Sequence, residues 1–152
     1  MSVIKTEYQT PLIGAYLVLV KNNQILLSRR NDTQYKGVYS LVCGHVEKGE
    51  DIIDAMIREA KEEIGITLDR TDTKVIAAVH RPAANYKNEI VDIIDFFVLA
   101  HEYSGEINNL EPDKTQEVVF CEIEKIPTNC TRQVKKALEL FKTSEFYGVI
   151  KS

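Results

Sequence analysis

The sequence is poor in the residues that build metal or redox centres from nitrogen and sulfur ligands. It contains three cysteines and three histidines among 152 residues. The cysteines form no CxxC pair and the histidines form no HExxH motif; they are Cys43, Cys121, Cys130, His45, His80 and His101. A zinc site is therefore not expected, and an odd number of scattered cysteines is typical of free thiols in a reducing compartment.

Long apolar runs and linker-like segments are absent as well. No stretch approaches the roughly 20 apolar residues that a membrane-spanning helix needs, and the opening MSVIKTEYQT lacks the apolar core of a secretory signal. Glycine, proline and serine form no cluster, and the sequence shows no internal repeat. With 44% hydrophobic and 28% charged residues, we expect one cytoplasmic domain over residues 1–152.

Positive charge is outnumbered. The sequence has 19 lysines and arginines against 23 aspartates and glutamates, which gives a formal net charge of −4. Binding to duplex nucleic acid needs a basic face, so that class of partner is not expected, and neither is a membrane. An acidic protein can still bind a phosphorylated small molecule if metal ions bridge the two.

Hydrophobic patterning predicts six strands and two helices. One helix is expected to begin near Asp51 and a second to run from about Thr131 to Thr143. The polar segments PAANYKN and GEINNLEPDKTQ are expected to be loops. The expected strands cover residues 12–20, 24–30, 38–42, 74–81, 89–103 and 117–123, the first two forming a hairpin. Two helices flanking a mixed sheet indicate an α/β layer architecture.

The first of these helices carries three glutamates on one strip. At about 100° per residue, Glu59, Glu62 and Glu63 share one sector, with Ala55 and Ile52 beside them. The neighbouring stripe is suited to the sheet and contains Ile53, Met56, Ile57, Ala60 and Ile64. Like charges three and four residues apart repel. The helix is therefore either a solvated surface with an Arg58–Glu62 pair, or a site where a hard cation such as Mg²⁺ offsets the repulsion.

The residues in front of these glutamates favour the metal site. The segment 44–66, GHVEKGEDIIDAMIREAKEEIGI, resembles the Nudix box of the Nudix hydrolases. Seven positions match at the specified spacing, which is far more specific than a three-glycine fingerprint; they are Gly44, Glu50, Arg58, Glu59, Glu62, Glu63 and Gly65, followed by Ile66. The resemblance implies a Nudix-type α/β/α sandwich, with a mixed β-sheet between helices, and hydrolysis of a nucleoside diphosphate linked to another moiety.

The resemblance also implies a metal centre. Glu59 and Glu63 would be the principal ligands of Mg²⁺, for which Mn²⁺ can substitute. Glu62 would add a ligand or hold a water, and the backbone carbonyl of Cys43 would be a further ligand. Glu50 and Arg58 would brace the loop and helix between the glycines Gly44 and Gly65.

Further roles outside the box follow from similarity to MutT-like members. The base that accepts a proton from water would be Glu59 itself or an acid outside the box, Glu111 in the second polar loop, with Glu117 as the runner-up. Substrate contacts would come from Arg30, Tyr39 and Asn129, although Asn129 can equally cap a turn. Phe96 or Phe97 could stack on a base, but neighbours on a strand face opposite sides, so at least one should be core.

The sequence departs from many MutT-like members where it reads Val42-Cys43-Gly44 in place of Pro-Gly-Gly, and Cys43 restricts a backbone that glycine leaves free. It also lacks a counterpart of a second base-contacting arginine on the sheet, so specificity for oxidised guanine is not implied. We expect hydrolysis of a nucleoside triphosphate to a monophosphate and pyrophosphate by a monomer or homodimer. The alternatives are ADP-ribose or another nucleotide sugar, dinucleoside polyphosphates, or a non-catalytic ligand sensor.

Overall fold

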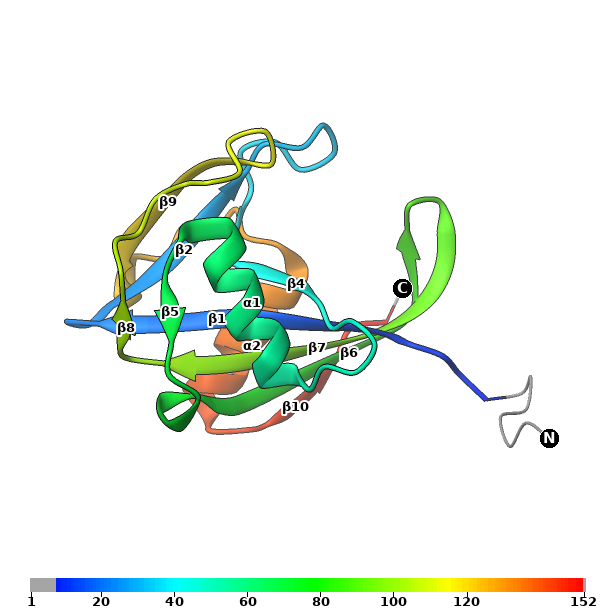
Figure 1. The fold of residues 1–152 in the computed structure, drawn as a ribbon. Coiled ribbons are helices and arrows are strands. Elements are labelled where there is room, and N and C mark those ends of the chain that lie inside the picture. The colour runs from blue at the N-terminus through cyan, green and yellow to red at the C-terminus, as the bar shows by residue number, and fades with distance from the viewer. Residues whose placement is uncertain (1–7, 152) are drawn as a thin grey trace.

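The computed structural model of the protein describes residues 8–151, in which a mixed sheet lies between two helices (Figure 1). The helices are α1 (Ile52–Ile64) and α2 (Arg132–Thr143), and short 3₁₀ turns cover Arg70–Asp72 and Ile123–Lys125. The strands are β1 (Leu12–Lys21), β2 (Gln24–Arg30), β3 (Tyr39–Ser40), β4 (Cys43–His45), β5 (Thr67–Leu68), β6 (Lys74–Tyr86), β7 (Glu89–Ala100), β8 (Tyr103–Ser104), β9 (Thr115–Glu122) and β10 (Tyr147–Val149). The predicted α/β sandwich is confirmed, and no helix among the described residues is long and apolar enough to cross a membrane.

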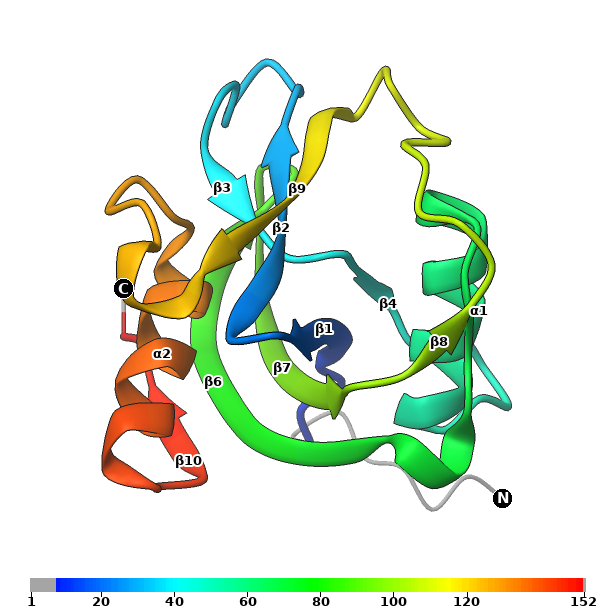
Figure 2. The same cartoon turned by 90° about the vertical axis from the view of Figure 1, so that its left-hand side faces the viewer.

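Strand β1 is the centre of the sheet and divides it. One edge of β1 pairs in parallel with β7 along Leu12–Leu19. Its other edge is shared, since β4 pairs with Gly14–Tyr16 and β2 pairs with Val20 and Lys21. Figure 2 shows β2 and β4 running apart from this common neighbour. The short strand β4 is therefore held on the sheet at the point where the sheet opens.

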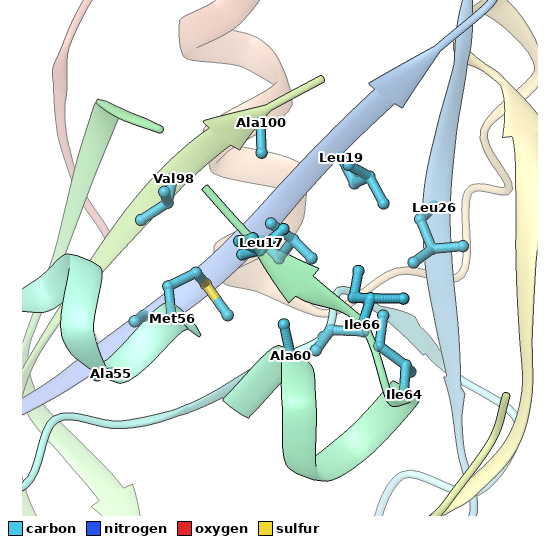
Figure 3. Packing of buried hydrophobic residues seen from close by; sticks show 13 residues of the cluster. Leu17, Leu19, Leu26, Ala55, Met56, Ala60, Ile64, Ile66, Val98 and Ala100 are labelled. Atoms are coloured by element: carbon cyan, nitrogen blue, oxygen red, sulfur yellow. The ribbon is translucent and has the colours of Figure 1, made fainter. Parts of the chain in front are cut away.

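The alternation of side chains along β1 produces two cores. On one face, Leu17 and Leu19 are buried against α1, where Figure 3 shows Leu17 close to Met56 and Ala60. On the other face, Tyr16 and Val18 pack with Phe97 and with the apolar side of α2. Both helices are thus held by opposite faces of the same strands, as the period of two along a strand requires.

Helix α1 begins where the sequence predicts. Asp51 is its N-cap, and Asp51 and Asp54 each accept a hydrogen bond from the other's backbone N–H, at 2.7 and 3.0 Å. Gly65 ends the helix at a φ of 77°, a left-handed conformation that glycine adopts without strain. Ala55 lies fully buried, whereas the wheel placed it beside the glutamates, because its small side chain lets this part of the helix lie close to the sheet.

The sheet differs from the sequence-based prediction in several places, among them the strand predicted at 89–103, which is β7 followed by the separate strand β8. The segment PAANYKN is not a loop: β6 and β7 continue through it to a two-residue turn at Lys87 and Asn88, both with positive φ. Pro82 is tolerated because it falls in a bulge between Arg81 and Ala84, where the ladder is already interrupted. The strand predicted at 38–42 is only Tyr39–Ser40, and a separate strand, β4, follows it.

Candidate active site

Gly44 on β4 lies directly against Glu59 on α1. A Cβ atom at position 44 would come within 2.1 Å of the Glu59 carboxyl carbon, a distance that no side chain tolerates. The carboxyl group of Glu59 therefore occupies the space that the glycine leaves free. A side chain at position 44 would force the Glu59 carboxyl group to move to another position.

Arg58 organises the rest of this helix face. Its guanidinium donates to both carboxylate oxygens of Glu50, at 2.8 and 3.0 Å, and to the carbonyl of His45 at 3.0 Å. It also donates to Glu59 at 2.7 Å. The predicted surface pair with Glu62 is the weakest of these contacts, at 3.4 Å, and Glu62 is 55% exposed. Arg58 therefore braces the loop and the helix, as the resemblance implies.

Glu63 is a carboxyl group whose charge is poorly compensated. Burial, followed by the neighbouring carboxylates of Glu59 and Glu111, raises its pKa to about 8, and a hydrogen bond with the backbone of Cys43 only partly opposes this. Burial also raises the pKa of Glu59, while Arg58 opposes the shift and Glu62 and Glu111 add to it. Three acidic side chains thus repel one another in a partly buried place, which is the condition that a bound cation relieves.

The polar loop that carries Glu111 is fastened to the end of α1. The backbone N–H groups of Asn108 and Leu110 donate to the carbonyls of Ile64 and Glu63, each at 3.0 Å. The Asn109 side chain closes the loop by donating to the carbonyl of Thr115 at 2.7 Å. The structure therefore brings Glu111 to the glutamates of α1. The runner-up, Glu117 on β9, instead lies opposite Arg29 on β2, with 3.8 Å between their charged groups.

The donor set suits a hard cation, although it is not yet arranged as a coordination sphere. Within residues 8–151, no three His, Cys, Asp or Glu side chains converge as metal ligands. The Glu59 carboxylate instead accepts a hydrogen bond from Arg58. The available atoms are nevertheless carboxylate oxygens around the backbone of Cys43, and such oxygens are what Mg²⁺ and Mn²⁺ bind. The raised pKa of Glu63 marks a carboxyl group that gains most from a cation.

The predicted substrate-binding residues fall into two groups. The Tyr39 N–H donates to the carbonyl of Asn129 at 2.9 Å, and the Asn129 side chain donates to the carbonyl of Gly37 at 3.3 Å. The neighbour of these two residues is Arg29, whose guanidinium lies 5.3 Å from the centre of the Tyr39 ring. Arg30 lies apart from them, bonded to Asp32 and 4.9 Å from the ring centre of Tyr35.

Two further side chains are assigned by their burial. Phe97 is fully buried and stacks on Tyr16 with 4.8 Å between ring centres, so it belongs to the core. Burial, with a smaller contribution from Glu63, raises the pKa of the Cys43 thiol to about 12. This thiol stays protonated near neutral pH and is not an activated nucleophile.

Sequence reasoning missed one buried ionic pair near this site, Arg81 on β6 with Asp95 on β7. The signal was present, since Asp95 interrupts the otherwise apolar run IIDFFVLA. An acidic residue inside a buried strand needs a partner. Its partner could not be identified from the sequence, because the two residues meet only through the pairing of β6 with β7.

Comparison with known proteins gives the family. The model of the NUDIX domain matches residues 10–142. An ADP-ribose pyrophosphatase of Methanocaldococcus jannaschii is 29% identical over 79% of this chain and 67% of its own length. An NAD-capped RNA hydrolase, NudC, of Stutzerimonas stutzeri is 38% identical over 41% of this chain, which corresponds to only 22% of that relative.

Solved structures agree. The crystal structure of a MutT NUDIX hydrolase from Burkholderia pseudomallei superposes with a TM-score of 0.75 and 28% identity, over 86% of this chain and 98% of the other. The region that matches the family model includes the whole box, the braced helix and the loop that carries Glu111. The chain therefore belongs to the Nudix family and is a MutT-like Nudix hydrolase.

Proposed function

We propose that this hydrolase cleaves a nucleoside triphosphate to a nucleoside monophosphate and pyrophosphate, with Mg²⁺ as its cofactor and Mn²⁺ as a substitute. The observation that supports this most directly is the cluster of carboxyl groups at Glu59, Glu63 and Glu111, in which burial, followed by mutual repulsion, raises the pKa of Glu63 to about 8. A cluster of carboxyl groups of this kind can hold a divalent cation that binds a polyphosphate substrate.

In this proposal Glu59, Glu62 and Glu63 hold the cation together with the backbone carbonyl of Cys43. A bound divalent ion neutralises the charge of the phosphates and polarises the reacting centre. Arg58 keeps Glu59 in position through its contact at 2.7 Å and is itself held by Glu50. The protein's contribution is therefore to orient oxygen ligands before substrate arrives.

Glu111 is the proposed general base. Attack of water on phosphorus breaks one phosphoanhydride bond, and the proton released from that water must be accepted by a nearby group. Glu111 lies close enough to raise the pKa of both Glu59 and Glu63. Its loop is held to α1 by backbone hydrogen bonds, so its carboxylate is available without a large movement of the chain.

A second candidate substrate is ADP-ribose. The archaeal relative that is named for this activity matches 79% of this chain, a larger share than the NudC relative matches. Both substrates carry a nucleoside diphosphate, so the same carboxylates would serve either one. They differ in the group attached to the diphosphate, which the box residues do not contact in this proposal.

A substrate panel separates the two. The purified protein is incubated with the eight common ribo- and deoxyribonucleoside triphosphates, ADP-ribose and a dinucleoside tetraphosphate, with Mg²⁺, with Mn²⁺ or with chelator. Release of pyrophosphate from a triphosphate in the presence of metal supports the proposal, whereas AMP formation from ADP-ribose alone would replace it with the second candidate. Turnover that persists in chelator would overturn the role of the metal.

A further inference from the structure

The Arg81–Asp95 pair is the most deeply buried ionic pair that the structure describes, and none of the proposed catalytic steps uses it. The guanidinium of Arg81 donates to Asp95 through Nε at 2.7 Å and through Nη2 at 3.2 Å. Asp95 is 1% exposed, whereas Arg81 is 22% exposed. The carboxylate is therefore sealed inside the protein, and part of the guanidinium still reaches the surface.

Neighbouring residues from several elements fix the position of the Asp95 carboxylate. The Tyr16 hydroxyl hydrogen-bonds its carboxylate and accepts a hydrogen bond from Gln133 at 3.0 Å. Gly14 leaves the room it needs, since a Cβ there would lie 2.7 Å from Asp95 Oδ1. Strands β1, β6 and β7 and helix α2 thus fix one carboxylate, and that carboxylate fixes the plane of one guanidinium.

The Arg81 guanidinium has N–H donors that Asp95 does not use. Arginine has five N–H donors and no acceptor, and Asp95 takes two of them. Among the described residues, the remaining donors meet no acceptor. A partly exposed guanidinium with unused donors is a suitable place for a planar ligand that presents hydrogen-bond acceptors.

This place adjoins the glutamate cluster through β4. Gly44 faces Glu59, while Cys43 and His45 are paired with Tyr16 and Gly14 and so face the side of Asp95. The backbone of Cys43 hydrogen-bonds Glu63. The Asp95 carboxylate adds to the effect of burial in raising the pKa of Cys43, and it opposes the effect of burial in lowering the pKa of His45. Arg81 and the glutamates thus lie on opposite faces at β4, and a ligand that reaches both would pass the point where the sheet divides.

We infer that Arg81, positioned by Asp95, determines which nucleobase the site accepts, and that it favours bases that present a carbonyl oxygen over bases that present an amino group. This inference rests on the proposed function. A guanidinium only donates hydrogen bonds, so it matches O6 and N7 of guanine and O4 of uracil or thymine. The amino groups of adenine and cytosine at the same positions are donors and do not match.

The test compares base preference between variants. For the wild type, kcat/KM is expected to be about tenfold higher for GTP than for ATP, and for UTP than for CTP, the discrimination typical of a good arginine–base contact. Arg81→Met removes every side-chain donor, and Asp95→Asn removes the carboxylate that orients the guanidinium; both should bring the two ratios close to one. Since either change can weaken a buried pair, Arg81→Gln/Asp95→Asn, which leaves no unpaired charge, is measured beside them.

His80→Gln is the matched control. His80 is the neighbour of Arg81 on β6 and also pairs with an aspartate of β7, Asp92, at 2.9 Å. This control should leave both ratios unchanged, and melting temperatures show which variants remain folded. A wild type without preference for the carbonyl bases, or a double variant that loses activity equally on all four nucleotides, would overturn the inference.

Binding separates this inference from the proposed function. Calorimetric titration of GMP, UMP, AMP and CMP in chelator measures base preference without hydrolysis. A preference for GMP and UMP that disappears in the double variant supports the role of Arg81 even if no triphosphate is cleaved. Hydrolysis without any base preference in either assay would leave the proposed function standing and overturn the role of Arg81.

Discussion

Glu63 on α1 lies beside the backbone of Cys43 on β4, and this contact joins the helix to the point where the sheet divides. The sequence separates the two residues by a loop and most of a helix. This contact places a partly buried carboxyl group next to a backbone segment that the family resemblance assigns to the metal centre.

The pKa of Glu63 makes a prediction about stability without metal. The folded-state pKa is raised from 4.5 to about 8, so the folded protein binds this proton more tightly than the unfolded chain does. The stability that results is fully present below pH 4.5 and is lost as pH rises through about 8. We expect the metal-free protein to lose on the order of a few kcal/mol across this range.

The Glu63→Gln variant tests whether ionisation of Glu63 causes this loss of stability. The variant has no proton to lose at this position, so its melting temperature in chelator should fall less than that of the wild type between pH 5 and pH 8. Parallel melting curves for the two proteins over this range would show that another group is responsible. Added Mg²⁺ should raise the melting temperature of the wild type most at the upper end of the range, where Glu63 is ionised.

Gly44→Ala should abolish most activity while the protein remains folded. The new methyl group would collide with the Glu59 carboxyl carbon, which lies 2.1 Å from its position, so the Glu59 carboxyl group must move away from this place. We expect kcat to fall by about 100-fold or more, as for the loss of a group that organises charge in the transition state.

Gly49→Ala is the control for this change. Gly49 has a φ of 83°, but a Cβ atom at this position would meet no other atom within 4 Å, so the substitution strains the backbone of the same loop without touching Glu59. It should lower stability by about 1 kcal/mol and leave kcat nearly unchanged. Equal losses of kcat in both variants would mean that loop conformation, and not the position of Glu59, is what matters.

Glu111→Gln should lower kcat by about 100-fold or more, in the range found when a general base is removed. Glu117→Gln should stay within a few-fold of the wild type, because Glu117 lies opposite Arg29 and not among the helical glutamates. Rates are measured under substrate saturation from pH 5 to pH 9. If Glu117→Gln is the slower enzyme, the assignment of the base to Glu111 is wrong.

Cys43→Ser should retain most activity. The thiol has a pKa of about 12, so almost none of it is ionised at neutral pH, and only the backbone of this residue is assigned a role. Mass spectrometry after treatment with iodoacetamide should show slow modification of Cys43 at pH 7. Loss of activity in the serine variant to the level of Gly44→Ala would contradict the view that the side chain is dispensable.

The metal-site candidates could be predicted from the sequence because their geometry is local. Glu59 and Glu63 are one helical turn apart, and the caps at Asp51 and Gly65 fix where that helix begins and ends. The loop between β4 and α1 is short, so Gly44 must lie close to the helix. Helical spacing places the three glutamates on one strip, whereas the positions of Gly44 and Cys43 beside them were implied by the resemblance to the Nudix box.

The substrate side could not be predicted in the same way. The register of β2 shifts between Arg29 and Arg30, so alternation alone does not decide which arginine neighbours Tyr39. Arg81 and Asp95 meet because β6 and β7 form a bulged hairpin, and the polar end of that hairpin was predicted to be a loop. The strands β5, β8 and β10 contain only two or three residues, too few for a periodic pattern.

The central claim is that the glutamates of α1 form a metal-dependent catalytic centre. The most direct measurement is a Mg²⁺ titration of pyrophosphate release from the preferred triphosphate, with wild type and Glu63→Gln compared at pH 8.5. The account predicts saturable activation of the wild type by Mg²⁺ and a folded variant with at most about 1% of its activity at any concentration. A variant that reaches the wild-type rate with the same Mg²⁺ dependence would contradict it.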